Sequence, residues 1–319
     1  MTQTLAPDTL TDIELPLPGR RVGKVRVAYE LSDDRMLFIT TDRLSAFDKV
    51  VAAVPYKGQV LNQLAAWWFA TSGHIVANHA ISEPDPNALI AVAAHPLPVE
   101  VVVRGHITGV TSTSLWKRYA QGQRVLYGHQ LPDGLRKNQE LPTPLITPTT
   151  KAEAGAHDEA LTCAEVTEFG LLDEKLWAHV QEVALALFDH GVVTARRAGL
   201  ILADTKYEFG LAPDGSLLLI DEVHTPDSSR FWESDSYDDR MRAGEEPESL
   251  DKEIVRRALA DTGYNGDGPT PVLPNSVWSE TSARYQRAFE RLTASNFEAG
   301  ATPIADRIKT NLEYLWAAS

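Results

Sequence analysis

The stretch "LADTKYEFGLAPDGSLLLIDEV", residues 202–223, predicts two neighbouring strands joined by a tight turn. Proline, aspartate and glycine at 213–215 stand between two apolar runs, which is a strong hairpin signal. With a two-residue turn at Asp214-Gly215, Glu208 lies directly opposite Asp221. A loop with an odd number of residues, or a bulge, would break this register.

Two opposed carboxylates require a cation between them. Directly opposed residues have Cβ atoms about 5 Å apart, where like charges destabilise a sheet. Because one or two carboxylates commonly hold Mg²⁺ beside nucleotide phosphates, we expect Glu208 and Asp221 to bind Mg²⁺. Side chains alternate along a strand, so Asp204 and Lys206 share the face of Glu208.

The plainer alternative is a solvated strand face whose charges happen to alternate. The segment "TPDSSR", residues 225–230, weighs against it, because it adds Ser229 and Arg230 just past the strand end. Strand ends that open into such loops are typical ligand sites.

The composition limits the classes of function. A chain of 319 residues can form one large domain or two modest ones. The net charge of −14 argues against nucleic acid or an anionic membrane as partner, so an anionic ligand needs a locally basic pocket. A single cysteine, Cys163, fits a reducing compartment. We find neither a secretory signal nor an apolar run of about 20 residues, so we expect a cytoplasmic protein.

Apolar spacing outlines the other elements. The segment 141–159 holds three prolines and is predicted to be a loop. The pattern predicts strands at 24–31, 35–41 and 97–109, and helices at 60–72, at 172–190 with Gly191 after the last turn, and from Pro303 onward.

Three further segments carry candidate ligand-binding residues. Gly23, with Lys24 and Arg26 beside it, could cover nucleotide phosphates as a glycine-bearing turn does in kinases, or could be a basic exposed strand. A Walker A motif is absent from the sequence. Glu100 lies inside the apolar run that ends at Arg104, where a carboxylate is costly unless it is paired, so its role is a structural pair or a ligand contact.

Lys151 lies in the threonine-rich part of the segment 141–159 and is either solvated or a phosphate ligand. The histidines form no H-E-x-x-H motif and no cluster with cysteine, which argues against a zinc site.

Together these segments resemble the SAICAR synthetase (phosphoribosylaminoimidazole-succinocarboxamide synthase) family. "LPVEVVVRGHITG" (97–109) and "LADTKYEFG" (202–210) look like its two signatures. The segments "GKVRVAYE", "TTDRLSAFD", "YKGQVLNQLAAWWF", "TPTTKAEAGAHDE" and "IDEVHTPDSSRFW" follow the family's order, so the likeness covers nearly the whole chain.

The resemblance implies an α+β fold, with a kinase-like antiparallel nucleotide lobe at 1–103 and a larger α/β part at 104–319 that ends in helices. It implies a ligase of purine biosynthesis that joins L-aspartate to carboxyaminoimidazole ribotide and converts ATP to ADP and phosphate. The implied partners are these three small molecules, with Mg²⁺ as cofactor, and the oligomeric state stays open.

The resemblance also implies roles for single residues. Glu208 and Asp221 match the metal-associated acids, Lys206 is expected to steady the transferring phosphoryl group or the carboxylate, and Asp204 is our candidate general base. Many members have serine where this chain has Val110, so either Ser112 or Ser114 can supply that hydroxyl. The nucleotide-binding residues are Gly23, Lys24, Arg26, Glu100 and Lys151, and the ribotide-binding residues are Arg104, Ser112 or Ser114, Ser229 and Arg230.

Two other functions remain open from the sequence. A small-molecule kinase with the same nucleotide lobe would release ADP without aspartate. A nucleotide-sensing or scaffold protein of this fold would tolerate loss of the acids, yet Asp204, Lys206, Glu208 and Asp221 are all present.

Overall fold

The computed structural model describes residues 8–47, 49–110, 114–151, 159–264, 266 and 268–317. These residues form an α+β structure built on two five-stranded antiparallel sheets. The predicted fold class is therefore confirmed.

The first sheet has the order β1-β2-β3-β7-β6, and the second has the order β11-β8-β12-β13, with β14 also beside β12. The described strands are β1 (Arg21–Val22), β2 (Arg26–Leu31), β3 (Arg35–Thr40), β4 (Arg43–Ala46), β5 (Lys49–Ala53), β6 (Ala80–Asp85), β7 (Ala88–Val92), β8 (His95–His106), β9 (Val125–Leu126), β10 (His129–Gln130), β11 (Glu140–Thr150), β12 (Leu200–Leu211), β13 (Leu217–Ile220) and β14 (Ser229–Glu233). The described helices are α1 (Lys57–Ser72), α2 (Leu115–Ala120), α3 (Cys163–Glu168), α4 (Glu174–Arg197), α5 (Ser234–Ala243), α6 (Glu253–Asp261), α7 (Asn275–Thr293) and α8 (Ile304–Leu312), followed by the 3-10 turn η1 (Glu313–Leu315).

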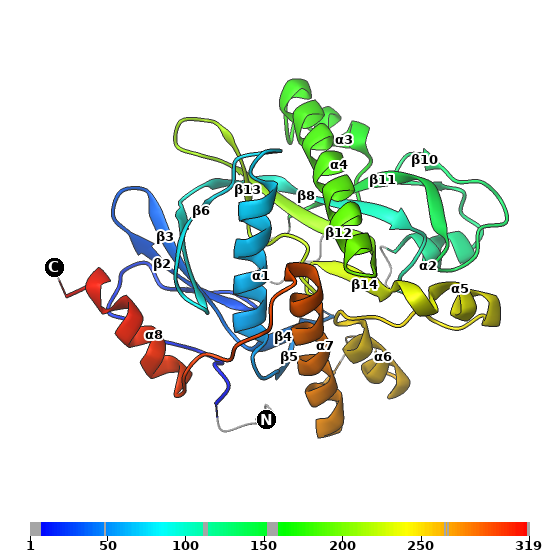
Figure 1. The fold of residues 1–319 in the computed structure, drawn as a ribbon. Helices are drawn as coiled ribbons and strands as arrows, with labels where there is room; N and C mark the ends of the chain where they lie inside the picture. The colour runs from blue at the N-terminus through cyan, green and yellow to red at the C-terminus, as the bar shows by residue number, and fades with distance from the viewer. Residues whose placement is uncertain are drawn as a thin grey trace.

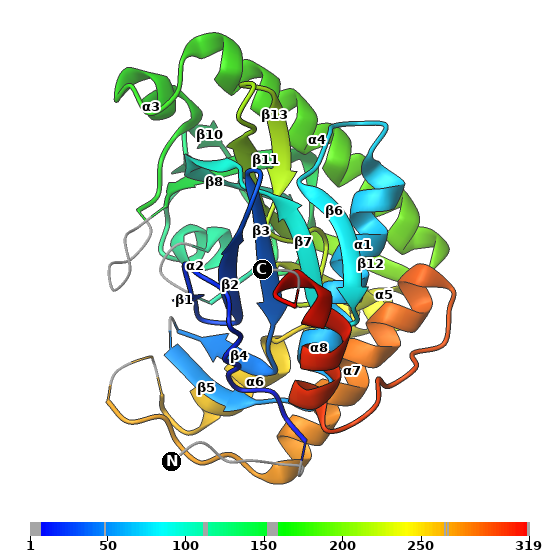
Figure 2. The ribbon, with the colours of Figure 1, turned by 90° about the vertical axis from the view of Figure 1, so that its left-hand side faces the viewer.

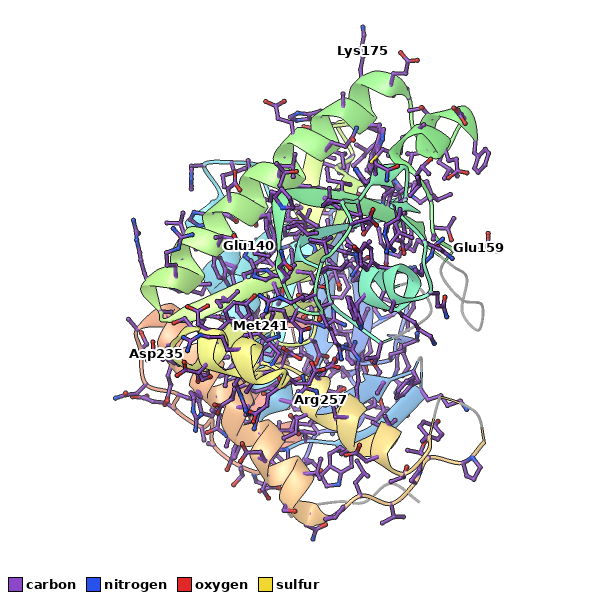
Figure 3. All side chains as sticks on the ribbon, turned by 90° about the vertical axis from the view of Figure 1, so that its right-hand side faces the viewer. Glu140, Glu159, Lys175, Asp235, Met241 and Arg257 are labelled. Carbon is purple, nitrogen blue, oxygen red and sulfur yellow. The ribbon has the colours of Figure 1, made fainter. Side chains whose placement is uncertain are left out.

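Helices cover both sheets. Figure 1 shows the first sheet with α8 on the left and the second sheet with α4 on the right. Figure 2 shows β2, β3, β7 and β6 side by side, with α8 in front of them. Lys175 projects into solvent from the outer end of α4 (Figure 3). Within the described ranges, no helix is long and apolar enough to cross a membrane.

The first predicted hairpin is confirmed. β2 and β3 pair from Arg26 with Thr40 to Leu31 with Arg35. Asp33 and Asp34 in the turn have φ values of 60° and 52°, which suit the tight turns that match strand twist. One face of this sheet forms a core with α8, made of Val27, Tyr29, Leu37, Ile39, Ile304, Ile308 and Leu312 among others.

The helix at 172–190 continues further than predicted. α4 runs to Arg197, so Gly191 lies inside it and not after its last turn. A Cβ at Gly191 would lie 2.4 Å from His224 Cε1 and 2.7 Å from Leu202 Cδ2. Glycine is therefore needed here for close approach between helix and sheet, and it does not end the helix.

The prediction of a loop at 141–159 is wrong for its first part. β11 pairs with β8 from Thr150 with Val99 to Leu145 with Arg104, and an irregularity follows toward Glu140. Proline is tolerated because β11 lies at the edge of the sheet, where one side of the backbone has no neighbouring strand.

The chain passes between the sheets directly before β8. β7 ends at Val92 in the first sheet, and β8 begins at His95 in the second. The predicted division after residue 103 falls inside β8. A division into two lobes remains a prediction, and the crossing at 93–94 is where such a boundary would lie.

Candidate active site

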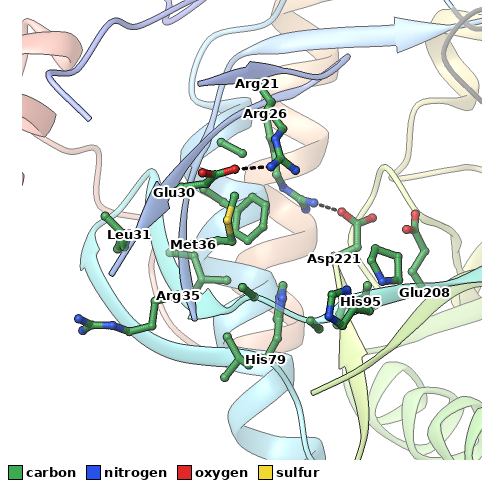
Figure 4. Close-up of a pocket in the computed structure, with 18 of the residues that line it drawn as sticks. Arg21, Arg26, Glu30, Leu31, Arg35, Met36, His79, His95, Glu208 and Asp221 are labelled. Carbon is green, nitrogen blue, oxygen red and sulfur yellow. Dashed lines mark hydrogen bonds and ion pairs between the residues drawn. The ribbon is translucent and has the colours of Figure 1, made fainter. Parts of the chain in front are cut away.

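A cavity of about 610 Å³ lies where the two sheets meet, because residues of both sheets line it. Its apolar lining includes Ala28, Phe38, Leu89 and Ile220. Figure 4 shows Arg26 of the first sheet pointing toward Asp221, with Glu208 nearby. Apolar walls with a few convergent charged groups are typical of a small-molecule site. The charged lining includes Arg21, Arg26, Glu30, Asp34, Arg35, Lys151, Glu208 and Asp221.

The predicted register of the second hairpin is wrong by one residue. Glu208 pairs with Ile220, and not with Asp221. A hydrogen bond of 2.9 Å closes the turn across 212–216, so the loop holds three residues, and Gly215 takes a φ of +85°. Asp221 therefore lies past the strand end, with a φ of 67°, yet it lines the same cavity as Glu208.

The carboxylate directly opposite Glu208 is Glu100 of β8. Lys206 donates to Glu100 Oε1 at 3.0 Å and also to Glu208, and Lys151 bonds to Glu208. Burial would raise the pKa of Glu208, but Lys206 and Lys151 lower it to about 2. The structure thus contains an opposed pair of acids with a cation between them, formed by Glu100 and Glu208 with Lys206.

Asp221 has a cation of its own. Arg26 forms an ion pair with Asp221 Oδ1, and its second amino group lies 3.7 Å from Glu222 Oε2. Among the described residues, no group of three His, Cys, Asp or Glu side chains could hold a metal ion. Mg²⁺ often takes only one or two carboxylate ligands and completes its coordination with phosphates and water. Glu208 and Asp221 line the same cavity, so these two carboxylates fit such a magnesium site.

A second charged cluster surrounds Asp204. Asp204 pairs across the sheet with Arg104 of β8 and Arg230 of β14. Its Oδ2 accepts from both guanidinium groups, with 3.2 Å to Arg104 Nη1. Arg104 also donates to Thr147 Oγ1 at 2.9 Å, and Arg230 Nε lies 3.8 Å from Glu253 Oε2. Two arginines on one carboxylate, one buried and one partly buried, can bind a substrate anion.

One predicted serine lies close to this cluster. A Cβ at Gly109, whose φ is +96°, would be 2.6 Å from Ser114 Cβ and 3.4 Å from Arg230 Nη2. Ser114 and Arg230 therefore both lie close to Gly109, where its side chain would be. Ser229 is buried, and its hydroxyl is 2.7 Å from a threonine hydroxyl on β12. Ser112 lies outside the described residues.

The glycine-bearing turn lies beside the cavity. Gly23 and Lys24 are exposed, and neither is among the described residues that line the cavity. Arg43 holds the turn by donating to Gly23 O at 2.8 Å and to Lys24 O at 3.0 Å. Arg21 lines the cavity, and sequence reasoning missed it although it lies in the basic run before Gly23.

Sequence reasoning also missed a buried ion pair that joins the start of α1 to the segment between β13 and β14. Lys57 and Asp227 lie 2.8 Å apart, and their side chains are 0% and 4% exposed. The hydroxyl of Tyr285 donates to Asp227 at 2.6 Å. Lys57 begins α1, where the helix dipole disfavours a positive charge, so a lysine at that position was a signal of a specific partner.

Comparison with known proteins gives the family. The sequence profile of the SAICAR synthetase family matches residues 20–271. The chain belongs to the SAICAR synthetase family. The Legionella pneumophila phosphoribosylaminoimidazole-succinocarboxamide synthase is 45% identical over 312 residues, which cover 97% of this chain and 99% of that protein. The chloroplastic enzyme of Arabidopsis thaliana is 45% identical over 307 residues, 94% of this chain and 74% of that protein.

Solved SAICAR synthetases have the same fold. The enzyme from Saccharomyces cerevisiae in complex with SAICAR superimposes with a TM-score of 0.78 at 35% identity, over 91% of this chain and 100% of that one. A SAICAR synthetase in complex with ADP gives 0.67 at 25% identity, over 88% and 100% of the two chains. The predicted family is confirmed, and with it the ATP-dependent ligase activity in purine biosynthesis.

Proposed function

We propose that this SAICAR synthetase binds Mg·ATP in the cavity between the sheets and the ribotide at the cluster around Asp204. One observation supports this assignment most strongly. Asp204, Lys206 and Glu208 alternate along β12 and therefore lie on one face of the strand, at intervals of about 7 Å. Lys206 is then between the two sites, where a phosphoryl group would pass from ATP to the ribotide carboxylate.

The residues of this chain have distinct tasks in that transfer. Arg104 and Arg230 hold the anionic ribotide, with Ser229 and either Ser112 or Ser114 beside it. Lys206 neutralises the charge that develops as an oxygen of the ribotide carboxylate attacks the γ-phosphorus and ADP leaves. Mg²⁺ held by Glu208 and Asp221 would supply further neutralisation at the phosphates.

The second step forms the amide bond. The neutral amine of L-aspartate attacks the acyl carbon of the acyl phosphate, phosphate leaves, and the proton of the amine passes to a base. Asp204 is our candidate for that base. Its Oδ2 accepts from Arg104 and Arg230, so it becomes available when the substrate anion takes over those arginines.

The nucleotide contacts follow from the lining of the cavity. Arg26 and Lys151 reach the phosphates from opposite sheets, and Arg21 joins them at the mouth. Gly23 and Lys24 cover the phosphates if the turn between β1 and β2 closes over the cavity. Glu100 acts through Lys206, to which it bonds.

The test of this function is ADP release by the purified protein with Mg·ATP, with each co-substrate omitted in turn. We expect release to require both carboxyaminoimidazole ribotide and L-aspartate. Release that needs the ribotide but not aspartate would instead support a small-molecule kinase and contradict the amide chemistry.

A further inference from the structure

Behind the site, a tyrosine and a histidine bond to each other on the other face of β12. The hydroxyl of Tyr207 and Nε2 of His224 are 2.5 Å apart, and both side chains are fully buried. Tyr207 stands between Lys206 and Glu208 in β12, so its side chain points away from theirs. The bond therefore joins the strand that carries Glu208 to the segment that carries Asp221.

That segment has an unusual backbone. Asp221 and His224 have φ values of 67° and 46°, which L-residues other than glycine rarely adopt. Such conformations persist only where surrounding contacts determine them, and they concentrate at functional sites. Here the ring of His224 packs edge-on against Trp68, with centroids 4.5 Å apart, and Val223 is fully buried in the main core.

The absence of a side chain at Gly191 leaves space for the ring of His224. A Cβ at Gly191 of α4 would lie 2.4 Å from His224 Cε1. Burial lowers the pKa of His224 to about 3, so the ring is neutral at neutral pH and its Nε2 can accept a hydrogen bond. The Tyr207 hydroxyl can donate that bond.

We propose that the hydrogen bond between Tyr207 and His224 fixes the separation of Glu208 and Asp221 and thereby sets the affinity for magnesium-bound nucleotide. The proposal rests on the proposed function, which assigns these two carboxylates to Mg²⁺. Tyr207 and His224 are positioning residues, since they act through Glu208 and Asp221 from the opposite face of the strand. Mutation of outer-shell partners that orient metal ligands typically lowers metal affinity by about 10- to 100-fold.

The test removes only the hydroxyl, by Tyr207→Phe. Calorimetry measures the Kd of ADP with Mg²⁺ and with EDTA. We expect the Kd of Mg·ADP to rise about tenfold in the variant, while the Kd of ADP in EDTA stays unchanged. A merely structural role would lower the Tm and leave the ratio of the two Kd values at that of the wild type.

Tyr29→Phe is the matched control. Tyr29 is also fully buried, and its hydroxyl donates to Ile13 O at 2.8 Å and accepts from Leu15 N at 3.0 Å, away from the cavity in the core with α8. We expect a lower Tm and no change in either Kd.

Variants of His224 complete the experiment. His224→Gln keeps an acceptor for the Tyr207 hydroxyl, so we expect Mg²⁺ to strengthen ADP binding nearly as much as in the wild type. In His224→Leu we expect this strengthening by Mg²⁺ to be lost. If Tyr207→Phe keeps the wild-type ratio of Kd values, the proposal is overturned while the proposed function stands. A wild-type protein whose ADP affinity does not change with Mg²⁺ would overturn the metal assignment itself.

Discussion

Glu208 meets another carboxylate, Glu100, directly across the sheet, and Lys206 joins the two. Opposed like charges destabilise a sheet, and Lys206 compensates them here by bonding to both acids. A lysine held between two acids beside the cavity is the arrangement expected if the proposed phosphoryl transfer takes place there.

For turnover, we expect the charge of Glu208 and Asp221, the proposed magnesium ligands, to matter more than their size. Glu208→Gln and Asp221→Asn should each fold and lower kcat with Mg·ATP by on the order of a hundredfold, since a metal at the phosphates is worth several kcal/mol. Steady-state kinetics at saturating substrates measures this, with Asp214→Asn in the exposed turn of the same hairpin as control. Unchanged turnover in either variant would contradict the metal assignment.

The buried pair of Lys57 and Asp227 is expected to dominate local stability. Burial would raise the pKa of Asp227, but Lys57 and Lys252 hold it below its usual range. Asp227→Asn leaves a buried lysine without its charged partner, so the free energy of unfolding at pH 7 should fall by about 3–5 kcal/mol. Urea unfolding measures this difference.

The same pair predicts a pH dependence. A depressed folded pKa contributes stability above the unfolded pKa and loses it as the pH falls through the folded pKa. The difference between wild type and Asp227→Asn should therefore shrink below about pH 4. Asp133→Asn, at an exposed pair with Arg124, should change the free energy of unfolding little at any pH. A constant difference across this range would show that lost packing, and not charge, explains the Asp227 effect.

Single residues could be predicted where local alternation decides them. The shared face of Asp204, Lys206 and Glu208 on β12 follows from the two-residue alternation of a strand. Glu100 and Arg104 stood out as charges within an apolar run. Arg21 and Arg35 could not be found in this way, because they enter the cavity only when the two sheets meet.

Whole elements were predicted where apolar periodicity is strong. The hairpin of β2 and β3 and the strand at β8 followed from the sequence. β11 did not, because its prolines indicate a loop unless the strand is known to lie at an edge. The register of β12 and β13 depended on whether the turn has two or three residues, which its Pro-Asp-Gly sequence does not decide.

Gly191 tests the packing of α4 on the second sheet. Alanine favours a helix over glycine by up to about 1 kcal/mol, but a Cβ here would clash with His224 and Leu202. Because overpacking costs about 1–3 kcal/mol, Gly191→Ala should lower the free energy of unfolding by about 1–2 kcal/mol. Val193→Ala, at an exposed position of the same helix, should change it by less than about 0.5 kcal/mol. A more stable Gly191→Ala would contradict the close approach.

At the scale of the whole molecule, the site exists only because two sheets share it. Arg26 comes from the first sheet, while Lys206, Glu208 and Asp221 come from the second sheet or the end of its strand β13. The protein carries a net charge of −14, so the basic side chains at the cavity form a local positive region in an acidic molecule. An anionic ligand requires such a region. No local sequence pattern predicts how the two sheets pack against each other. At this scale the resemblance to a family therefore contributed more to the prediction than apolar periodicity did.

In the proposed mechanism, β12 joins the nucleotide to the ribotide through Lys206. The most direct measurement is a crystal structure of the protein with Mg²⁺, ADP and carboxyaminoimidazole ribotide. We expect Lys206 Nζ within about 3.2 Å of a ribotide carboxylate oxygen, with Arg104 and Arg230 on the ribotide and the ADP phosphates at the Glu208 end. A ribotide bound away from Asp204, with Lys206 still bonded only to Glu100 and Glu208, would contradict it.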